Sequence, residues 1–268
     1  MKKIKKNHLK EISPPDAEIN NLLQSYQNGQ YDDAEKLAQF LTERFPKHQF
    51  AWKVLGALFE QTGRVREAVI PSQKSVQLSP QDAEAHSNLG NTFKALGRLD
   101  EAEVSYMKAI ALNPNHVQSH NNLGFILQNL GRLDEAEVSY RKAIALSPNY
   151  IIAHNNLGNT LQELDRLEEA EACLRQALVL EPNFAEALNN LGITLNKMGR
   201  LEDAETIYKQ AIALKPDFAD AFWNLSGCEK TIKDAEHWID KCLEVNENHQ
   251  LARLTKSALS FYQGNRDD

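Results

Sequence analysis

The sequence of 268 residues has few of the features that mark disulfide-rich, membrane-spanning or catalytic proteins. Its three cysteines, Cys173, Cys228 and Cys242, form no Cys-x-x-Cys pair, which argues against a disulfide framework or a zinc site. A reducing, cytoplasmic location is the simplest expectation. No run of about 18 apolar residues is present, so we expect no membrane span. The nucleophile elbow, the phosphate-binding loop and the His-Glu-x-x-His motif are also missing, so we expect no enzyme activity, cofactor or metal.

The net charge of −7 disfavours nucleic acid as a partner, because nucleic-acid binding usually needs a basic surface. The charge is uneven. Residues 1–14 contain five lysines and one glutamate, and residues 15–268 therefore carry a net charge of −11. The first segment has no apolar region typical of a secretory signal. We expect a disordered basic leader, with docking to an anionic surface as the alternative.

The feature that decides the fold is an internal repeat of 34 residues. Residues 83–116 read AEAHSNLGNTFKALGRLDEAEVSYMKAIALNPNH, and residues 117–150 read VQSHNNLGFILQNLGRLDEAEVSYRKAIALSPNY. The last copy is three residues short, and we place that deletion in its inter-helix turn. The seven copies are residues 15–48, 49–82, 83–116, 117–150, 151–184, 185–218 and 219–249.

Each copy encodes two helices joined by a turn. In residues 83–116, Ala85, Leu89 and Phe93 recur at helical spacing on one face. Gly97 suits the left-handed residue that closes a helix. Ala102 and Tyr106 then lie on the apolar stripe of a second helix, which Pro114 follows. A single pair of helices cannot cover its own apolar face, so neighbouring copies have to stack on one another.

The Leu-Gly, Ala, Tyr, Ala and Pro pattern at this spacing resembles the tetratricopeptide repeat (TPR) over residues 15–249. The resemblance implies an all-α, right-handed superhelical solenoid of stacked helix-turn-helix hairpins. It also implies that first helices line a concave groove and that second helices face outward. The function implied is a non-enzymatic scaffold that binds an extended segment of a partner protein.

Three departures from the pattern carry separate expectations. Asp165 replaces the turn glycine and should adopt its left-handed geometry. Pro71 lies inside a second helix and should kink or loosen it. Residues 250–268 read as one more first helix, which is either a capping helix or the first half of a truncated eighth repeat.

Asparagines recur on the helix face that the fold turns toward the groove. Position 6 of five successive repeats is asparagine, and the residues concerned are Asn88, Asn122, Asn156, Asn190 and Asn224. A side-chain amide can pair with both the C=O and the N–H of an extended peptide. The row resembles the asparagine ladder in the superhelix of O-GlcNAc transferases, which implies peptide binding. Further candidates at groove positions are Asn91, Asn121, Asn155, Asn159, Asn189, Lys94, Gln128 and Gln162.

Several alternatives remain open at this point. The asparagines can instead bond a neighbouring repeat or face solvent. The chain can be the substrate- or partner-recruiting arm of a larger enzyme, glycosyltransferase-like or another transferase, whose catalytic domain is absent here. Self-association through end repeats is a third possibility. His86, His120 and His154 recur at position 4, but stacked repeats keep them too far apart to share a metal ion, so we assign them a packing role.

Overall fold

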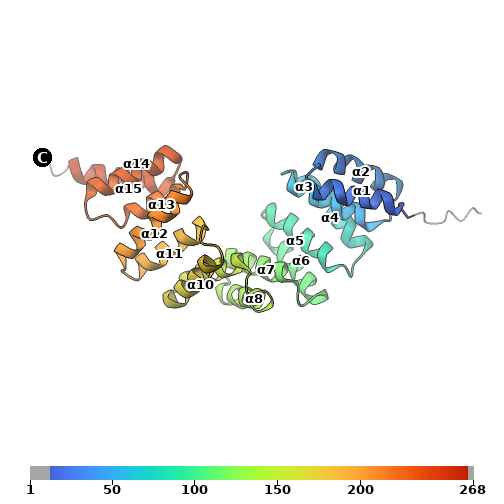
Figure 1. Ribbon diagram of the computed structural model, residues 1–268, viewed down its shortest axis with the longest axis horizontal. Helices are drawn as coiled ribbons and strands as arrows, with labels where there is room; N and C mark the ends of the chain where they lie inside the picture. Colours follow the sequence, from blue (N-terminus) through green and yellow to red (C-terminus); the bar gives the residue numbers. More distant parts are fainter. Residues whose placement is uncertain (1–12, 265–268) are drawn as a thin grey trace, which may run out of the picture. The chain divides into compact units, whose positions relative to one another are not determined.

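The computed structural model describes residues 13–264, and side chains as far as residue 260. The basic leader, apart from residues 13 and 14, lies outside this range, as do the last four residues. Between residues 13 and 264 the chain forms fifteen α-helices and no strand, as expected for an all-α solenoid (Figure 1). No helix in this range is both long and apolar enough to cross a lipid bilayer.

Odd-numbered helices are the first helices of the hairpins. They are α1 (Asp16–Gln27), α3 (Gln49–Gln61), α5 (Ala83–Ala95), α7 (Val117–Asn129), α9 (Ile151–Glu163), α11 (Ala185–Lys197), α13 (Ala219–Ser226) and α15 (Gln250–Gly264). Even-numbered helices are the second helices. They are α2 (Tyr31–Arg44), α4 (Val65–Leu78), α6 (Leu99–Leu112), α8 (Leu133–Leu146), α10 (Leu167–Leu180), α12 (Leu201–Leu214) and α14 (Ile232–Val245).

The turns inside the hairpins use left-handed backbone geometry. Gly97 and Gly199 have φ of 71° and 76°, values that favour glycine because it lacks a Cβ atom. Asp165 takes the same place with φ of 59°, which confirms the expectation from the sequence. The chain therefore reverses in the same way where the glycine is missing.

Close approach of the two helices of a hairpin requires glycine at position 8. A Cβ atom on Gly90 would lie 2.6 Å from the ring of Tyr106, and one on Gly192 would lie 2.5 Å from the ring of Tyr208. Both tyrosines are fully buried, as are Ala102 and Ala204 on the same second helices. A large aromatic ring on one helix thus fills the space left by a glycine on the other.

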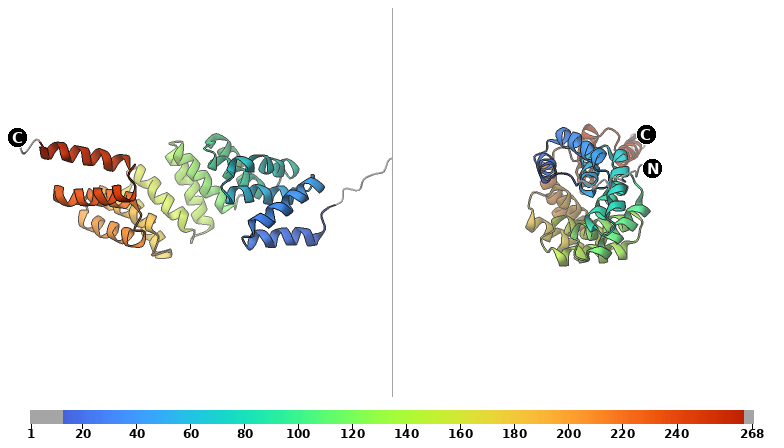
Figure 2. Two further views of the ribbon diagram at one scale, coloured as in Figure 1. Left: turned by 90° about the horizontal axis from the view of Figure 1, so that it is seen from above. Right: turned by 90° about the vertical axis from the view of Figure 1, so that its right-hand side faces the viewer.

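The described chain divides into two compact units, one ending at Leu130 and the other beginning at Gly131. Each unit has its own buried apolar clusters between successive helices, for example around Leu41 and Leu58 in the first unit and around Leu195 and Tyr208 in the second. In Figure 2 the helices of the first unit are coloured from blue to green, and those of the second unit run on to red.

Within each unit, consecutive first helices contact one another. These contacts join α1 to α3, α3 to α5 and α5 to α7 in the first unit, and α9 to α11 and α11 to α13 in the second. Among the described helices, consecutive second helices make no comparable contacts. First helices therefore lie on the inner side of the curvature of each unit.

The sequence placed the three-residue deletion of the last repeat in its turn, and the structure shows that this is wrong. Helix α13 has 8 residues, whereas α9 and α11 have 13 each. The chain leaves the helix after Ser226, and Thr231 then begins α14 by accepting a hydrogen bond on Oγ1 from the backbone N–H of Asp234 (3.1 Å). By contrast, α4 continues through the buried Pro71 without ending.

Candidate functional site

The five asparagines at position 6 all lie on first helices, and all are half-buried. We call them the amide row, and they are Asn88, Asn122, Asn156, Asn190 and Asn224. Asn88 and Asn122 belong to the first unit, and the other three belong to the second. Because first helices line the inner side of each unit, every member of the row lies on the inner face of its own unit.

In the second unit, row members donate to the preceding repeat. Nδ2 of Asn190 donates to Oδ1 of Asn155 (3.0 Å), and Nδ2 of Asn224 donates to Oδ1 of Asn189 (2.9 Å). Each bond joins position 6 of one repeat to position 5 of the repeat before it. Among residues 13–260, Oδ1 of Asn190 and Oδ1 of Asn224 have no hydrogen-bond partner, and neither atom is buried. Both oxygens are therefore accessible acceptors.

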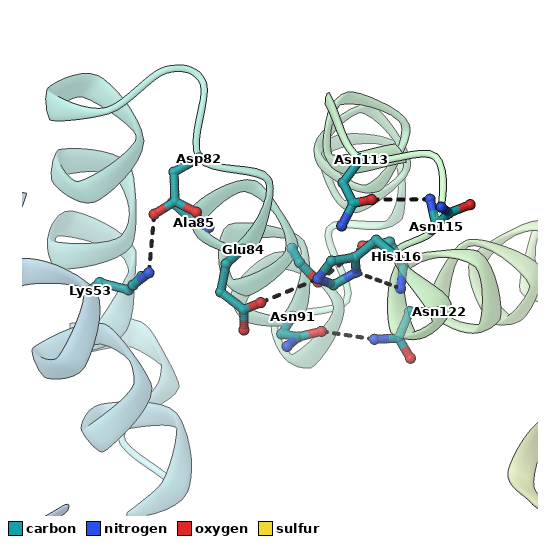
Figure 3. A network of polar contacts seen from close by, with 11 residues as sticks. Lys53, Asp82, Glu84, Ala85, Asn91, Asn113, Asn115, His116 and Asn122 are labelled. Atoms are coloured by element: carbon teal, nitrogen blue, oxygen red, sulfur yellow. Dashed lines mark hydrogen bonds and ion pairs between the residues drawn. The ribbon is translucent and has the colours of Figure 1, made fainter. Parts of the chain in front are cut away.

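The first unit achieves a similar link with different atoms (Figure 3). Nδ2 of Asn122 donates to Oδ1 of Asn91 (3.0 Å). The hydroxyl of Tyr106 donates to the same oxygen (2.8 Å). Position 5 of the preceding repeat is Ser87, whose hydroxyl pairs with that of Ser119 (3.1 Å). Since a serine side chain is too short to meet the row, Asn91 provides the acceptor.

Other predicted site residues are engaged within the chain. Asn121, Asn189 and Gln162 are buried. Nε2 of Gln162 donates to Oγ1 of Thr194 (3.0 Å) and to the carbonyl oxygen of Asn190 (3.3 Å). Asn159 and Gln128 are half-buried. The structure thus brings most of these amides together as links between repeats and leaves Asn88, Asn190 and Asn224 with accessible polar atoms.

A partly buried acid lies on the inner face of the first unit. The carboxylate of Glu60 accepts a hydrogen bond from the hydroxyl of Thr92, and burial raises the pKa of Glu60. Burial also lowers the pKa of Lys94, whose Nζ lies 3.5 Å from Oδ1 of Asn122 and 5.7 Å from the ring centre of Phe125. The first unit therefore presents charged groups that have been removed in part from water.

Family models place these helices in a known class. Three models, each described as tetratricopeptide repeat, match residues 83–116, residues 115–180, and residues 25–83 together with 155–219. Together they span residues 25–219, which is more than half of the chain. The chain belongs to the tetratricopeptide repeat family. No curated protein sequence matches this TPR chain significantly.

Solved TPR structures share the fold. The APC/C hetero-tetramer Cut9–Hcn1 matches with a TM-score of 0.74 and 21% identity over 92% of this chain, which spans about half (48%) of that chain. A tetratricopeptide repeat protein from Parabacteroides merdae gives 0.71 and 14% over 91% of this chain and 98% of that one. YrrB gives 0.55 and 24% over 69% of this chain and 97% of that one. Because all three identities are below 25%, these matches show a shared fold and not a shared function.

The TPR histidines at position 4 tie α5, α7 and α9 to the loops before them. Nε2 of His86, His120 and His154 lies 3.1, 2.9 and 2.8 Å from the carbonyl oxygens of Pro80, Pro114 and Pro148. Trp52 makes the same contact from Nε1 to Pro46 (3.0 Å). All three histidine side chains are buried, as expected for packing residues. Among the described residues, no cluster of His, Cys, Asp or Glu is arranged to hold a metal ion.

The sequence analysis did not single out Glu60 or Thr92. Glu60 occupies position 12 of its repeat, as Lys94 does in the next one. The sequence could therefore have indicated Glu60 as an acidic residue at a groove position. The hydrogen bond from Thr92 to Glu60 depends on the packing of α5 against α3, which the repeat spacing alone does not specify.

Proposed function

We propose that this TPR protein is a non-catalytic interaction scaffold that binds an extended segment of a partner protein along its first helices. The repeat family and the solved TPR structures support a scaffold, because stacked hairpins create long, continuous inner faces. YrrB is described as a TPR protein with an unusual peptide-binding site, and the shared fold makes a peptide ligand a reasonable choice here.

The single observation that carries the proposal is the state of Asn190 and Asn224. Each side chain is fixed by donating one N–H to the preceding repeat, which leaves its Oδ1 without a partner among the described residues. The second N–H of each amide also has no partner there. An amide held in this way can accept from a peptide N–H and donate to a peptide C=O without reading the peptide side chains. Fixing the rotamer beforehand lowers the entropy lost on binding.

The test uses a displayed library of random 12-residue peptides, selected on the wild-type chain and resynthesised with fluorescein. Asn190→Ala/Asn224→Ala should weaken their binding by roughly thirtyfold or more, because at least two hydrogen bonds are lost and each contributes about 1 kcal/mol net. The matched control is Asn149→Ala/Asn183→Ala, which removes two exposed loop amides. Circular dichroism verifies that both variants fold. Equal affinity of all three proteins for the selected peptides would refute the proposal.

A further inference from the structure

The last hairpin of the second unit contains a cavity of about 330 Å³ beside the amide row. Asn224 and Asn196 line its polar side, and Ile239, Leu259 and Ala235 line its apolar side. Its residues come from α11, α13, α14 and α15 and from Gly227, which follows α13, all within one unit. The cavity volume is at the lower end of the range of about 300–1,000 Å³ that is usual for ligand pockets.

One helix shortening and two residue replacements in the last repeat explain why space is left there. First, α13 ends at Ser226, whereas α11 continues for a further turn, in which Thr194 and Leu195 are fully buried. The chain that follows α13 buries Cys228 in the same apolar cluster as Leu225, but Gly227 before it adds no side chain and is exposed. Ala235, which aligns with the fully buried Ala102 and Ala204, is consequently only half-buried.

Second, Ile239 occupies the position that Tyr106 and Tyr208 hold in other repeats. Those tyrosine rings fill the space between the two helices of their hairpins. Third, Gly227 occupies the position of Asn91, whose oxygen accepts the hydrogen bond from Tyr106. The last repeat has thus lost both partners of that hydrogen bond as well as the end of its first helix.

Trp223 also lines the cavity. It stands at position 5, where other repeats have Ser87, Asn155 or Asn189. Its Nε1 donates to Oγ1 of Thr255 (3.4 Å), and its ring lies 5.9 Å from the ring of His249. The half-buried indole therefore offers an apolar face at the pocket, directly next to Asn224 in the sequence.

We propose that this cavity receives one large apolar side chain, of the size of leucine or phenylalanine, from the peptide whose backbone the amide row binds. This inference rests on the proposed function and adds side-chain selectivity to it. Asn224 lies both in the row and at the rim of the cavity, so a peptide bonded to that amide passes the opening. Burial of an apolar side chain against Ile239, Leu259 and Trp223 favours the complex, whereas a charged side chain would lose its hydration there.

The test is a host–guest series of fluorescein-labelled 12-residue peptides of alternating glycine, serine and alanine, with one central guest residue. The guests are alanine, leucine, phenylalanine and aspartate, and binding is followed by fluorescence polarisation. For the wild-type chain, leucine or phenylalanine should bind about tenfold more tightly than alanine, since burial of such a side chain contributes that much or more. Aspartate should bind no more tightly than alanine.

Ala235→Leu fills the cavity and should abolish the preference for apolar guests while leaving the alanine peptide unaffected. The matched control, Ala213→Leu, adds the same side chain to an exposed site on α12 and should retain the preference. Ser226→Gly/Ile239→Tyr fills the cavity in a second way, with the glycine and tyrosine found in other hairpins. Thermal unfolding shows whether each variant is folded, and at least one filling variant is expected to be.

The outcomes separate the two proposals. If the alanine peptide binds and the apolar guests add nothing, the pocket proposal is wrong and the scaffold proposal stands. If both filling variants keep the apolar preference, the pocket proposal is again wrong. If no peptide of the series binds, both proposals fail at this surface. A dimer seen by sedimentation and lost in Ala235→Leu, with no guest preference, would overturn the pocket proposal and assign the cavity to a second copy of the chain.

Discussion

Nδ2 of Asn224 donates to Oδ1 of Asn189 at 2.9 Å, and the two residues are 35 positions apart in the chain. Asn189 is buried, whereas Asn224 is half-buried and keeps its own oxygen accessible. One side chain of the pair therefore serves the contact between α11 and α13, and the other is held in place on the surface. Asn190 makes the same hydrogen bond to Asn155 in the preceding pair of repeats, although both members of that pair are half-buried.

The first prediction concerns the stability of this link. Asn224→Ala should lower the free energy of unfolding by about 1–3 kcal/mol, because the oxygen of the buried Asn189 loses its partner. Asn189→Ala should cost less, since water can hydrate the half-buried Asn224. Urea unfolding of both single variants and the double variant forms a double-mutant cycle, with an expected coupling of about 1 kcal/mol. Strict additivity would show that the hydrogen bond does not stabilise the stack.

The second prediction concerns the glycine of the hairpin contact. Gly192→Ala should lower the free energy of unfolding by about 1–3 kcal/mol, because its Cβ would lie 2.5 Å from the ring of the buried Tyr208. Gly227→Ala is the matched control, since its Cβ would meet its nearest neighbour, the carbonyl oxygen of Asn224, at an ordinary 3.4 Å. Thermal unfolding compares the two variants. Equal melting temperatures would contradict the assignment of Gly192 as a close-approach site.

The third prediction concerns the left-handed turn residue Asp165. Asp165→Gly should raise the free energy of unfolding by up to about 1 kcal/mol, because glycine adopts a φ of 59° without steric strain. Asp165→Ala should not stabilise the protein. As the reverse comparison, Gly199→Ala (φ of 76°) should be destabilising. Denaturant midpoints measured for the three variants decide, and a stabilising Gly199→Ala would invalidate the argument from backbone strain.

The fourth prediction concerns pH. Burial raises the pKa of Glu60, so the folded state binds a proton more readily than the unfolded state does. By linkage, ionised Glu60 destabilises the fold above its raised pKa, and this cost is lost as the pH falls through that pKa. Glu60→Gln can still accept from Thr92. It should therefore be more stable than wild type at pH 7.

That advantage should shrink as the pH falls and be absent once the pH is below 4.5, the ordinary value for glutamate. Denaturant unfolding from pH 4 to pH 8 measures the difference. Glu67→Gln, at an exposed position on the neighbouring α4, serves as the control. A Glu60→Gln advantage that is independent of pH would show that ionisation of Glu60 is not its source.

The repeat spacing was sufficient to predict the family, the helical hairpins and the turn geometry. Those features are local or recur at a fixed interval, so the same residues indicate them in one repeat after another. The left-handed Asp165 was predictable because its place in the repeat is that of Gly97 and Gly199. The shortening of α13 could not be predicted in this way. Its repeat lacks three residues, and the other repeats do not show whether the helix or the turn loses them.

The sequence by itself thus determined the all-α TPR architecture and the positions of the asparagines on one helix face. Only the tertiary structure decided which amides form hydrogen bonds between repeats and which remain accessible. The difference depends on the length of the side chain in the preceding repeat, such as Ser87 or Asn155. It also decided where a cavity opens. Ala235 and Ile239 are ordinary residues in sequence, and they line a cavity because α13 ends at Ser226.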